Sequence, residues 1–168
     1  PLESKPKLIK DCAKAVKRLR SAGCEKILIV WDLYPAWRID GEKPCRHEDK
    51  LAIKAALAAQ QIAPEDVVFL CIEEELEAWL IADGRALNAY FSKPHRKVDA
   101  IGDQKKPDIV SDPKGVLMGY FKQYKGGTKY EANMHAEQIV RLLPDFQRIR
   151  KSESFSRFHQ KLTNKAVK

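Results

Sequence analysis

The chain has 168 residues, of which 44% are hydrophobic and 32% are charged, and its formal net charge is +8. This length and composition are typical of one globular domain, so we expect a single domain over residues 1–168. No apolar run approaches the roughly 20 residues that a membrane-spanning helix needs, and the N-terminus has no signal-peptide pattern. We therefore expect a cytoplasmic protein that is not embedded in a membrane.

The charge is unevenly distributed along the chain. Residues 1–83 contain 13 Lys+Arg and 15 Asp+Glu, a net charge of −2, whereas residues 84–168 contain 18 and 8, a net charge of +10. An acidic half joined to a basic half suits a phosphate-backbone ligand that is held beside a metal ion. A solvated basic surface is the alternative interpretation. We expect nucleic acid or another polyanion as the partner.

The first part of the chain alternates helical and strand patterns. An amphipathic helix is expected after Pro6, and Gly23 is placed to end it as a capping glycine. Residues 26–31 (KILIVW) predict a buried strand, directly followed by Asp32, and residues 47–62 predict a second helix. The residues expected on the buried faces are Leu8, Cys12, Val16 and Leu19 in the first helix, and Leu51, Ala55, Ala58 and Ile62 in the second.

Residues 67–83 (VVFLCIEEELEAWLIAD) change from a strand pattern to a helical one. The apolar run 67–72 predicts a strand that is buried on both faces. Leu76, Trp79 and Leu80 then fall on one helical stripe, and four glutamates crowd the first turn. Negative charge at a helix N-terminus contributes only about 0.3–1 kcal/mol per residue, and neighbouring acids repel one another. A bound cation would offset that repulsion.

The order of these elements indicates a parallel strand pair joined by a helical crossover, with helices on both faces. Asp32 and Glu73 each follow a strand, so we expect both at the carboxyl edge of the sheet, where α/β proteins bind ligands. Glu73 and Glu77 are four residues apart and could share Mg²⁺ or Mn²⁺. The alternative for Glu77 is a solvated turn in which it pairs with Arg85 or Lys114.

The basic half, residues 84–168, is expected to be mostly helical. Asp112 and Pro113 predict the start of a helix, with Lys114 in its first turn. Lys114 could bind a phosphate there, or its stem could simply cover apolar surface. Further helices are expected over residues 130–143 and 154–162, and the segment SESFSRF is expected to cap and pack the last one.

Three pieces of the sequence together resemble an uncharacterised Toprim-like family: ILIVWD ending at Asp32, CIEEELEAWLIAD over residues 71–83, and SDPK with the later KSESFSRF. Members of that family are typically encoded beside ABC-type ATPases in bacterial antiphage defence loci. The family is similar to the nuclease half of overcoming-lysogenization-defect nucleases. The resemblance spans residues 26–162, and its most specific pieces are Glu77-Ala78-Trp79 and the later serine-phenylalanine segment.

The resemblance implies a Toprim fold, a small parallel sheet flanked by helices, here with a helical basic C-terminal part. It also implies acidic residues that bind Mg²⁺ for phosphodiester cleavage. Asp32 matches the first aspartate of the Toprim Asp-x-Asp motif, while Tyr34 stands where the second aspartate is expected. Glu73 and Glu77 match the acids after the next strand. A strand bearing a further glutamate is expected before the first helix, and residues 1–6 contain no apolar run to form it.

Two functions are consistent with this resemblance. The first is a metal-dependent nuclease or nuclease-like subunit, in which Asp32, Glu73 and Glu77 bind Mg²⁺ or Mn²⁺ and Lys114 contacts the phosphate backbone. The second is a catalytically degenerate module that binds nucleic acid or an ABC-type ATPase. The two differ in whether nucleic acid is cleaved.

Overall fold

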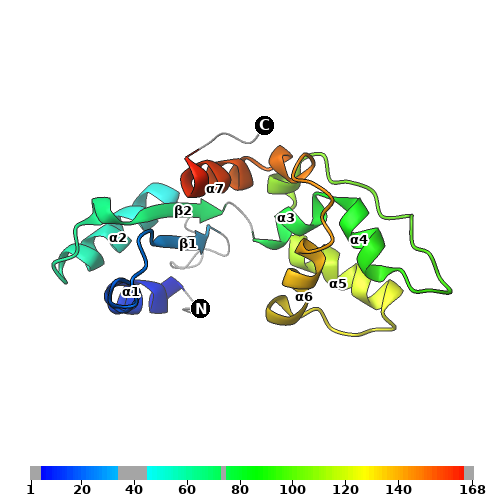
Figure 1. Ribbon diagram of the computed structural model, residues 1–168, viewed down its shortest axis with the longest axis horizontal. Helices are drawn as coiled ribbons and strands as arrows, with labels where there is room; N and C mark the ends of the chain where they lie inside the picture. Colours follow the sequence, from blue (N-terminus) through cyan, green and yellow to red (C-terminus); the bar gives the residue numbers. More distant parts are fainter. Residues whose placement is uncertain (1–4, 34–44, 73–74, 165–168) are drawn as a thin grey trace. The chain divides into compact units, whose positions relative to one another are not determined.

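The computed structural model describes residues 5–33, 45–72 and 75–164. These residues form seven α-helices, three 3-10 helices and a two-stranded parallel sheet, which confirms the predicted α/β class. The chain divides into two compact units, Pro1–Ile72 and Glu73–Lys168 (Figure 1). The division falls before Asp83, where the charge distribution changes, and the prediction of a single domain stays a prediction.

The N-terminal unit contains the sheet. Its elements are α1 (Lys5–Ser21), β1 (Leu28–Asp32), α2 (Arg46–Ala58), η1 (Pro64–Asp66) and β2 (Val68–Ile72). The two strands pair in parallel, as predicted, with Leu28 opposite Val68 and Asp32 opposite Ile72. Asp32 is therefore the last residue of β1, and its partner Ile72 is the residue before Glu73 in the sequence.

The end of α1 confirms the prediction for Gly23. This glycine has a φ of +80°, a left-handed conformation that favours glycine. Its amide donates to the carbonyl of Arg20, and the amide of Cys24 donates to the carbonyl of Leu19. These two bonds form a Schellman motif, which satisfies carbonyls that the helix itself leaves unpaired.

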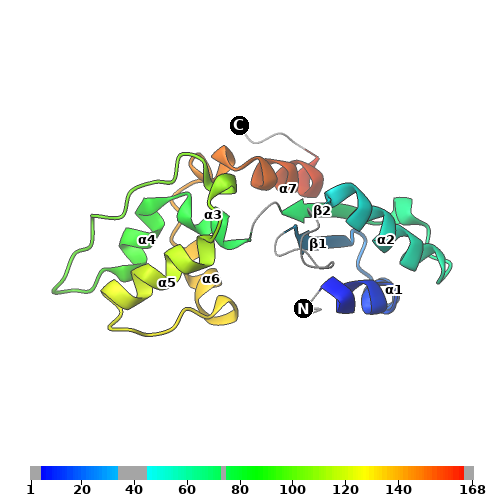
Figure 2. The ribbon, with the colours of Figure 1, turned by 180° about the vertical axis from the view of Figure 1, so that it is seen from behind.

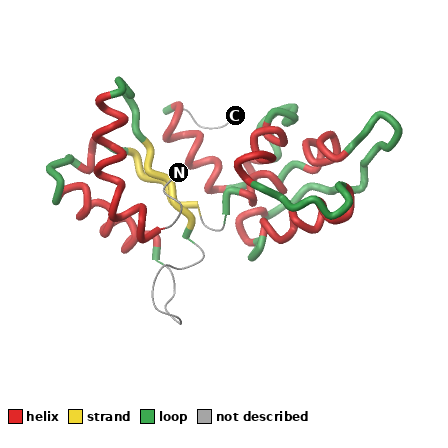
Figure 3. The backbone as a smooth tube through the Cα atoms, turned by 90° about the horizontal axis from the view of Figure 1, so that it is seen from below, coloured by secondary structure: helices red, strands yellow, loops and turns green. Residues whose placement is uncertain are grey.

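The core of the N-terminal unit lies on one face of the sheet. Ile29, Trp31 and Phe69 point to this face and pack against both α1 and α2, which lie on the same side of the strands in Figure 3. Val30 points to the opposite face and is 40% exposed. The prediction that residues 26–31 form a buried strand is therefore wrong for Val30, because α1 and α2 both pack on the opposite face. A helix on the other face stays a prediction.

The buried side of α2 differs from the predicted one. Its buried residues are Asp49, Ile53 and Leu57. The helix itself was predicted correctly, but the wrong side of it was predicted to be buried. The buried side contains an aspartate at a position where an apolar residue is usual, so the apolar pattern did not identify it. Of the four residues predicted to be buried, only Ile62 is buried. The other three are exposed to solvent: Leu51, Ala55 and Ala58.

The C-terminal unit is built around a short buried helix. Its elements are α3 (Glu77–Ile81), α4 (Gly84–Phe91), η2 (Pro107–Ile109), α5 (Pro113–Tyr124), α6 (Ala132–Val140), η3 (Ile149–Lys151) and α7 (Glu153–Thr163). Helix α3 contacts α4, α5, α6 and η2, and all five of its residues are buried (Figure 2). A helix surrounded on all sides by protein does not show the single apolar stripe predicted for it.

Helix α3 is shorter than the sequence predicts. It begins at Glu77, and Glu75 precedes it in an irregular segment. Leu76, predicted to be buried, is instead exposed at the start of the helix, whereas Trp79 and Leu80 are buried. The prediction that the glutamates occupy the first turn of this helix is therefore wrong for Glu75.

The remaining helices agree with the sequence except for α4, which was not predicted. Asp83 caps α4, and its side chain accepts a hydrogen bond from the Arg85 amide. Asp112 and Ser152 cap α5 and α7 in the same way, and the positive φ angles of Gly126 and Gly127 follow the end of α5. Among the helices of the described residues, none combines the length and the apolar character needed to cross a membrane.

Candidate functional site

Asp32 lies at the carboxyl end of β1 in the N-terminal unit, where the sequence predicted it. Next to it, the Trp31 indole Nε1 donates a hydrogen bond of 3.2 Å to Oδ2 of Asp49. Asp49 is only 1% exposed and was not recognised from the sequence. Its position four residues before Ile53 and eight before Leu57 is the signal that could have identified it. The bond fastens the first turn of α2 to the end of β1.

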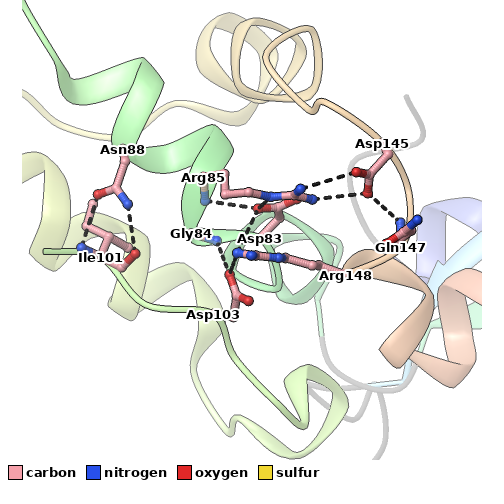
Figure 4. A network of polar contacts seen from close by, with 9 residues as sticks. All are labelled: Asp83, Gly84, Arg85, Asn88, Ile101, Asp103, Asp145, Gln147 and Arg148. Carbon is pink, nitrogen blue, oxygen red and sulfur yellow. Dashed lines mark hydrogen bonds and ion pairs between the residues drawn. The ribbon is translucent and has the colours of Figure 1, made fainter. Parts of the chain in front are cut away.

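Glu77 is the buried carboxylate of the C-terminal unit, with an exposed fraction of 7%. Neither of the two cations considered as its ion-pair partners is bound to it. Arg85 instead binds Asp83, with Nη2 2.7 Å from Oδ2, and Asp145, with Nη2 3.0 Å from Oδ1 (Figure 4). The predicted alternative, in which Glu77 pairs with Arg85 or Lys114, is therefore wrong within the described residues.

The N-terminus of α5 is capped by two carboxylates. Oδ1 of Asp112 accepts from the Gly115 amide at 2.7 Å, and Oε2 of Glu75 accepts from the Lys114 amide at 3.2 Å. Pro113 has no amide hydrogen to offer, and the Val116 amide donates to the Asp112 carbonyl. These amides are not available to a phosphate, so phosphate binding by Lys114 would depend on its exposed ammonium group.

The surroundings of the Glu75 carboxylate disfavour its charged form. Burial raises the pKa of Glu75 most, the hydrogen bond from the Lys114 amide lowers it, and the negative charge of Glu77 raises it again. Burial and a neighbouring negative charge both disfavour the ionised form of a carboxyl group. This is the electrostatic arrangement that a cation would relieve.

Tyr130 completes this group. It is 2% exposed, and its hydroxyl is the one fully buried side-chain polar atom of the described residues that has no hydrogen-bond partner of ordinary geometry. Burial raises its pKa most, and the nearby Glu77 carboxylate raises it further, through its charge and as a hydrogen-bond acceptor, followed by the charge of Glu75. These effects indicate that the Tyr130 hydroxyl lies near the Glu77 carboxylate. No spacing in the sequence indicates this contact.

Trp79, two residues after Glu77, is held by the start of α7. Its indole Nε1 donates to Ser154 Oγ at 2.8 Å, and Ser152 Oγ and Ser154 Oγ each donate to Oδ1 of Asp108, at 2.7 and 2.8 Å. Ser152 Oγ also accepts from the Phe155 amide, which confirms the predicted capping role of this segment. The contact joins the two pieces of sequence that were most specific in the resemblance, and it fixes the helix that begins with Glu77.

Two cation–π contacts between basic side chains and tyrosine rings lie elsewhere on the C-terminal unit. Lys125 Nζ lies 4.2 Å from the ring centre of Tyr90, and the Arg96 guanidinium lies 5.6 Å from that of Tyr124. The two tyrosines are half-buried. We call these four residues the aromatic–basic surface.

The structure thus brings together Glu75, Glu77, Tyr130 and the first turn of α5. Asp32 belongs to the other unit, and its placement beside Glu77 stays a prediction. Glu73 and Tyr34 lie outside the described residues. In the described part of the chain, no group of three or more His, Cys, Asp or Glu side chains is placed to hold one metal ion.

The fold and these carboxylates define an α/β protein with an acidic group at the start of its C-terminal unit. A family model described as Domain of unknown function (DUF4276) matches residues 4–163. Because the match covers nearly the whole chain, the protein belongs to this family. A comparison with curated proteins and one with solved structures each found no match.

Proposed function

We propose that this protein is a Toprim-like, divalent-metal-dependent nuclease or nuclease-like subunit, which acts on nucleic acid in the cytoplasm. The observation that carries the proposal is Glu77, a buried carboxylate with no cationic side chain bound to it in the described residues. Glutamate is rarely buried in a protein unless it is paired, and functional sites often retain such groups.

Three carboxylates would hold the cation in this proposal: Asp32, Glu73 and Glu77. Their oxygens are the ligands that Mg²⁺ and Mn²⁺ prefer. A cation bound there would polarise the scissile phosphate and favour ionisation of an attacking water. Glu77 is held in place because α3 is packed on all sides and Trp79 is fastened to Ser154. Lys114, exposed in the first turn of α5, would contribute its ammonium charge to a phosphate.

The nucleic-acid part of the proposal is supported by the aromatic–basic surface. Nucleic acids are bound by cations that contact phosphates and by aromatic rings on which bases stack. Lys125 and Arg96 are cations that could contact phosphates. Bases could stack on the exposed parts of Tyr90 and Tyr124. The charge of +10 on residues 84–168 favours the same ligand.

Cleavage is the first test. The purified chain, incubated with Mn²⁺ or Mg²⁺ and single- or double-stranded DNA or RNA, should cut at least one substrate and should stop when the cation is chelated. Glu77→Gln should lower the cleavage rate by about a hundredfold or more, because a ligand of the proposed cation loses its charge. Gln matches Glu in size, so the melting temperature should change little.

The matched control is Glu65→Gln, the same change at an exposed position of η1. It should leave the rate unaltered. Cleavage that survives Glu77→Gln at the full rate would show that the activity comes from elsewhere in the chain or from a contaminant.

A second candidate is a catalytically degenerate module that binds nucleic acid or an ABC-type ATPase. It is favoured by Tyr34, which stands in place of an acid of the Toprim motif. This candidate predicts that nucleic acid binds without being cut, under every metal tested. Co-expression with an ABC-type ATPase encoded beside the gene, followed by copurification, would test the partner, and addition of that ATPase to the cleavage assay would distinguish a dormant nuclease from a binding module.

A further inference from the structure

Two segments of the C-terminal unit contain six cations and no acidic residue. Residues 92–97 follow α4, and residues 120–129 include the end of α5 and the turn after it. Within the part of the chain that the structure describes, no carboxylate lies within ion-pair distance of any of these cations. We call these two stretches the basic segments, and their cations are Lys93, Arg96, Lys97, Lys122, Lys125 and Lys129.

Aromatic contacts bring the two basic segments together. The Arg96 guanidinium lies over the Tyr124 ring, 5.6 Å from its centre, and Lys125 Nζ lies 4.2 Å from the centre of the Tyr90 ring. Both tyrosine rings contact the buried ring of Phe91, with centroid separations of 5.1 Å for Tyr90 and 5.6 Å for Tyr124. The chain after α4 and the end of α5 accordingly lie side by side (Figures 1 and 2). The cations of both segments therefore share one surface.

The first basic segment is a hydrogen-bonded turn. The Lys93 amide donates to the Arg96 carbonyl at 2.9 Å, and the Arg96 amide donates to the Lys93 carbonyl at 3.0 Å. The Asn88 side chain bonds both the amide and the carbonyl of Ile101, which fixes the chain beyond the turn to α4 (Figure 4). These bonds hold like charges close together without a counter-charge. A polyanion would relieve their repulsion.

The aromatic contacts distinguish between classes of polyanion. A phosphate of any nucleic acid can contact Lys93 or Lys97, but a base can stack on a tyrosine or an arginine plane only when it is not stacked inside a duplex. Arg96 is exposed, and Tyr124 beneath it is supported by the buried Phe91. This pair is therefore suited to an unpaired base.

We propose that the basic segments bind single-stranded nucleic acid, with one base stacked on the Arg96–Tyr124 pair and the flanking phosphates on Lys93, Lys97 and Lys125. The inference rests on the proposed function for nucleic acid as the ligand. It adds the class of strand, the turn at residues 93–96 as a binding element, and a role for Arg96 beyond its charge.

The first test compares strands that differ only in their bases. Fluorescence anisotropy in EDTA measures binding of the full chain to oligo(dT), to an abasic strand of equal length and to the corresponding duplex. The wild type should bind oligo(dT) about fivefold or more tightly than the abasic strand, as expected for one stacked base. Equal affinity for the two strands, or tighter binding to the duplex, would overturn the inference.

Arg96→Lys separates stacking from charge, since lysine keeps the positive charge but has no planar guanidinium. It should weaken oligo(dT) binding about fivefold and leave both the abasic strand and the salt dependence unaffected. Tyr124→Leu should also remove the preference for oligo(dT), provided that its melting temperature shows a folded protein. The control is Arg141→Lys, the same change at an exposed arginine of α6. An unaltered preference in Arg96→Lys would contradict the proposed stacking.

The phosphate contacts are tested by Lys93→Gln combined with Lys97→Gln. This variant should reduce the slope of log affinity against log salt by about 1.4, the value for two phosphate contacts on a single strand. Lys105→Gln combined with Lys106→Gln removes the same charge at exposed positions outside the basic segments and should change the slope less. A larger effect of this control, or binding to phosphatidylserine vesicles but to no oligonucleotide, would contradict the inference.

The failure of this inference can be told apart from that of the proposed nuclease function, because binding is measured without metal. If the strand preference and the effects of the variants are found but no substrate is cut, the binding surface stands and the nuclease function fails. If nucleic acid is cut while Arg96→Lys and the Lys93/Lys97 variant bind as the wild type does, the nuclease function stands and this inference fails.

Discussion

Arg85 shows how single residues of the C-terminal unit are held. Its guanidinium binds the buried Asp83 through two nitrogens and also reaches Asp145, while Arg148 binds Asp103 at 2.6 Å (Figure 4). Paired geometry of this kind is the stronger form of an arginine–carboxylate contact. The network ties the start of α4 to residues far along the chain and accounts for why Arg85 is not available to Glu77.

Asp145 should make the stability of the protein depend on pH. The hydrogen bond from Arg85, followed by that from the Gln147 amide, lowers the pKa of Asp145 below its ordinary 3.8. A lowered pKa stabilises the folded state above pH 3.8, and this contribution is lost as the pH falls through the folded-state pKa. Asp145→Asn should therefore lower the melting temperature at neutral pH, and the difference from the wild type should shrink below pH 3.8.

The control for Asp145→Asn is Glu137→Gln, which breaks the exposed pair between Glu137 and Arg141 on α6. Exposed pairs of this kind contribute at most about 0.5 kcal/mol, so little change is expected. An equal effect of both variants at every pH would contradict the assignment to the Arg85 network.

At the scale of elements, the stability of helix α3 depends more on its contact with α7 than on the helix propensity of its own residues. A helix of five residues is too short to be stable alone, and α3 is held by the helices around it and by the bond from Trp79 to Ser154. This bond crosses 75 residues of sequence and belongs to a partly buried hydrogen-bonded group with Asp108. Networks of this type specify one packing arrangement when each member is satisfied.

Ser154→Ala tests this dependence. It leaves the Trp79 indole N–H without its acceptor, so the free energy of unfolding should fall by about 1–3 kcal/mol in urea denaturation. Trp79→Phe combined with Ser154→Ala should cost less than the sum of the two single changes, since the partner that was left unsatisfied is removed. Ser156→Ala, on the same helix with an exposed hydroxyl bond, should cost less than 1 kcal/mol. Strictly additive effects would contradict a coupled network.

At the scale of the whole molecule, the net charge of +8 means that the affinity for nucleic acid should depend strongly on salt concentration, which can be varied to test binding. Each cation that contacts a phosphate releases about 0.7–0.9 counterions, which sets the slope of log affinity against log salt. The aromatic–basic surface contributes Arg96 and Lys125, whereas α1 contributes the exposed Lys10, Lys14 and Lys17 beside a groove of about 490 Å³. The two surfaces can be compared within one protein.

Replacement of Arg96 and Lys125 by Gln should reduce the salt slope by about 1.4–1.8 and weaken binding of a labelled oligonucleotide in fluorescence anisotropy. Lys10→Gln with Lys14→Gln in α1 removes the same charge and should change the slope less. If the α1 variant has the larger effect, the nucleic acid binds on the N-terminal unit and the aromatic–basic surface is not its site.

The sequence by itself determined the features whose causes are local. The Schellman motif at Gly23, the caps at Asp112 and Ser152, and the two apolar strands were predicted because each signal lies within a few residues of its effect. The parallel pairing also followed from the order of strand, helix and strand.

Only the tertiary structure decided which polar groups are buried and what they contact. Asp49 meets Trp31, Arg85 meets Asp145, and Tyr130 lies beside Glu77, all across distances in sequence that helical or strand periodicity cannot span. The single apolar stripe predicted for α3 is not what the structure shows, because all five residues of this helix are buried. The acids of residues 73–77 could be recognised in the sequence as an unusual concentration of charge, but the surroundings of Glu75 and Glu77 depend on the packing of α3 against α5 and α6, which the fold alone establishes.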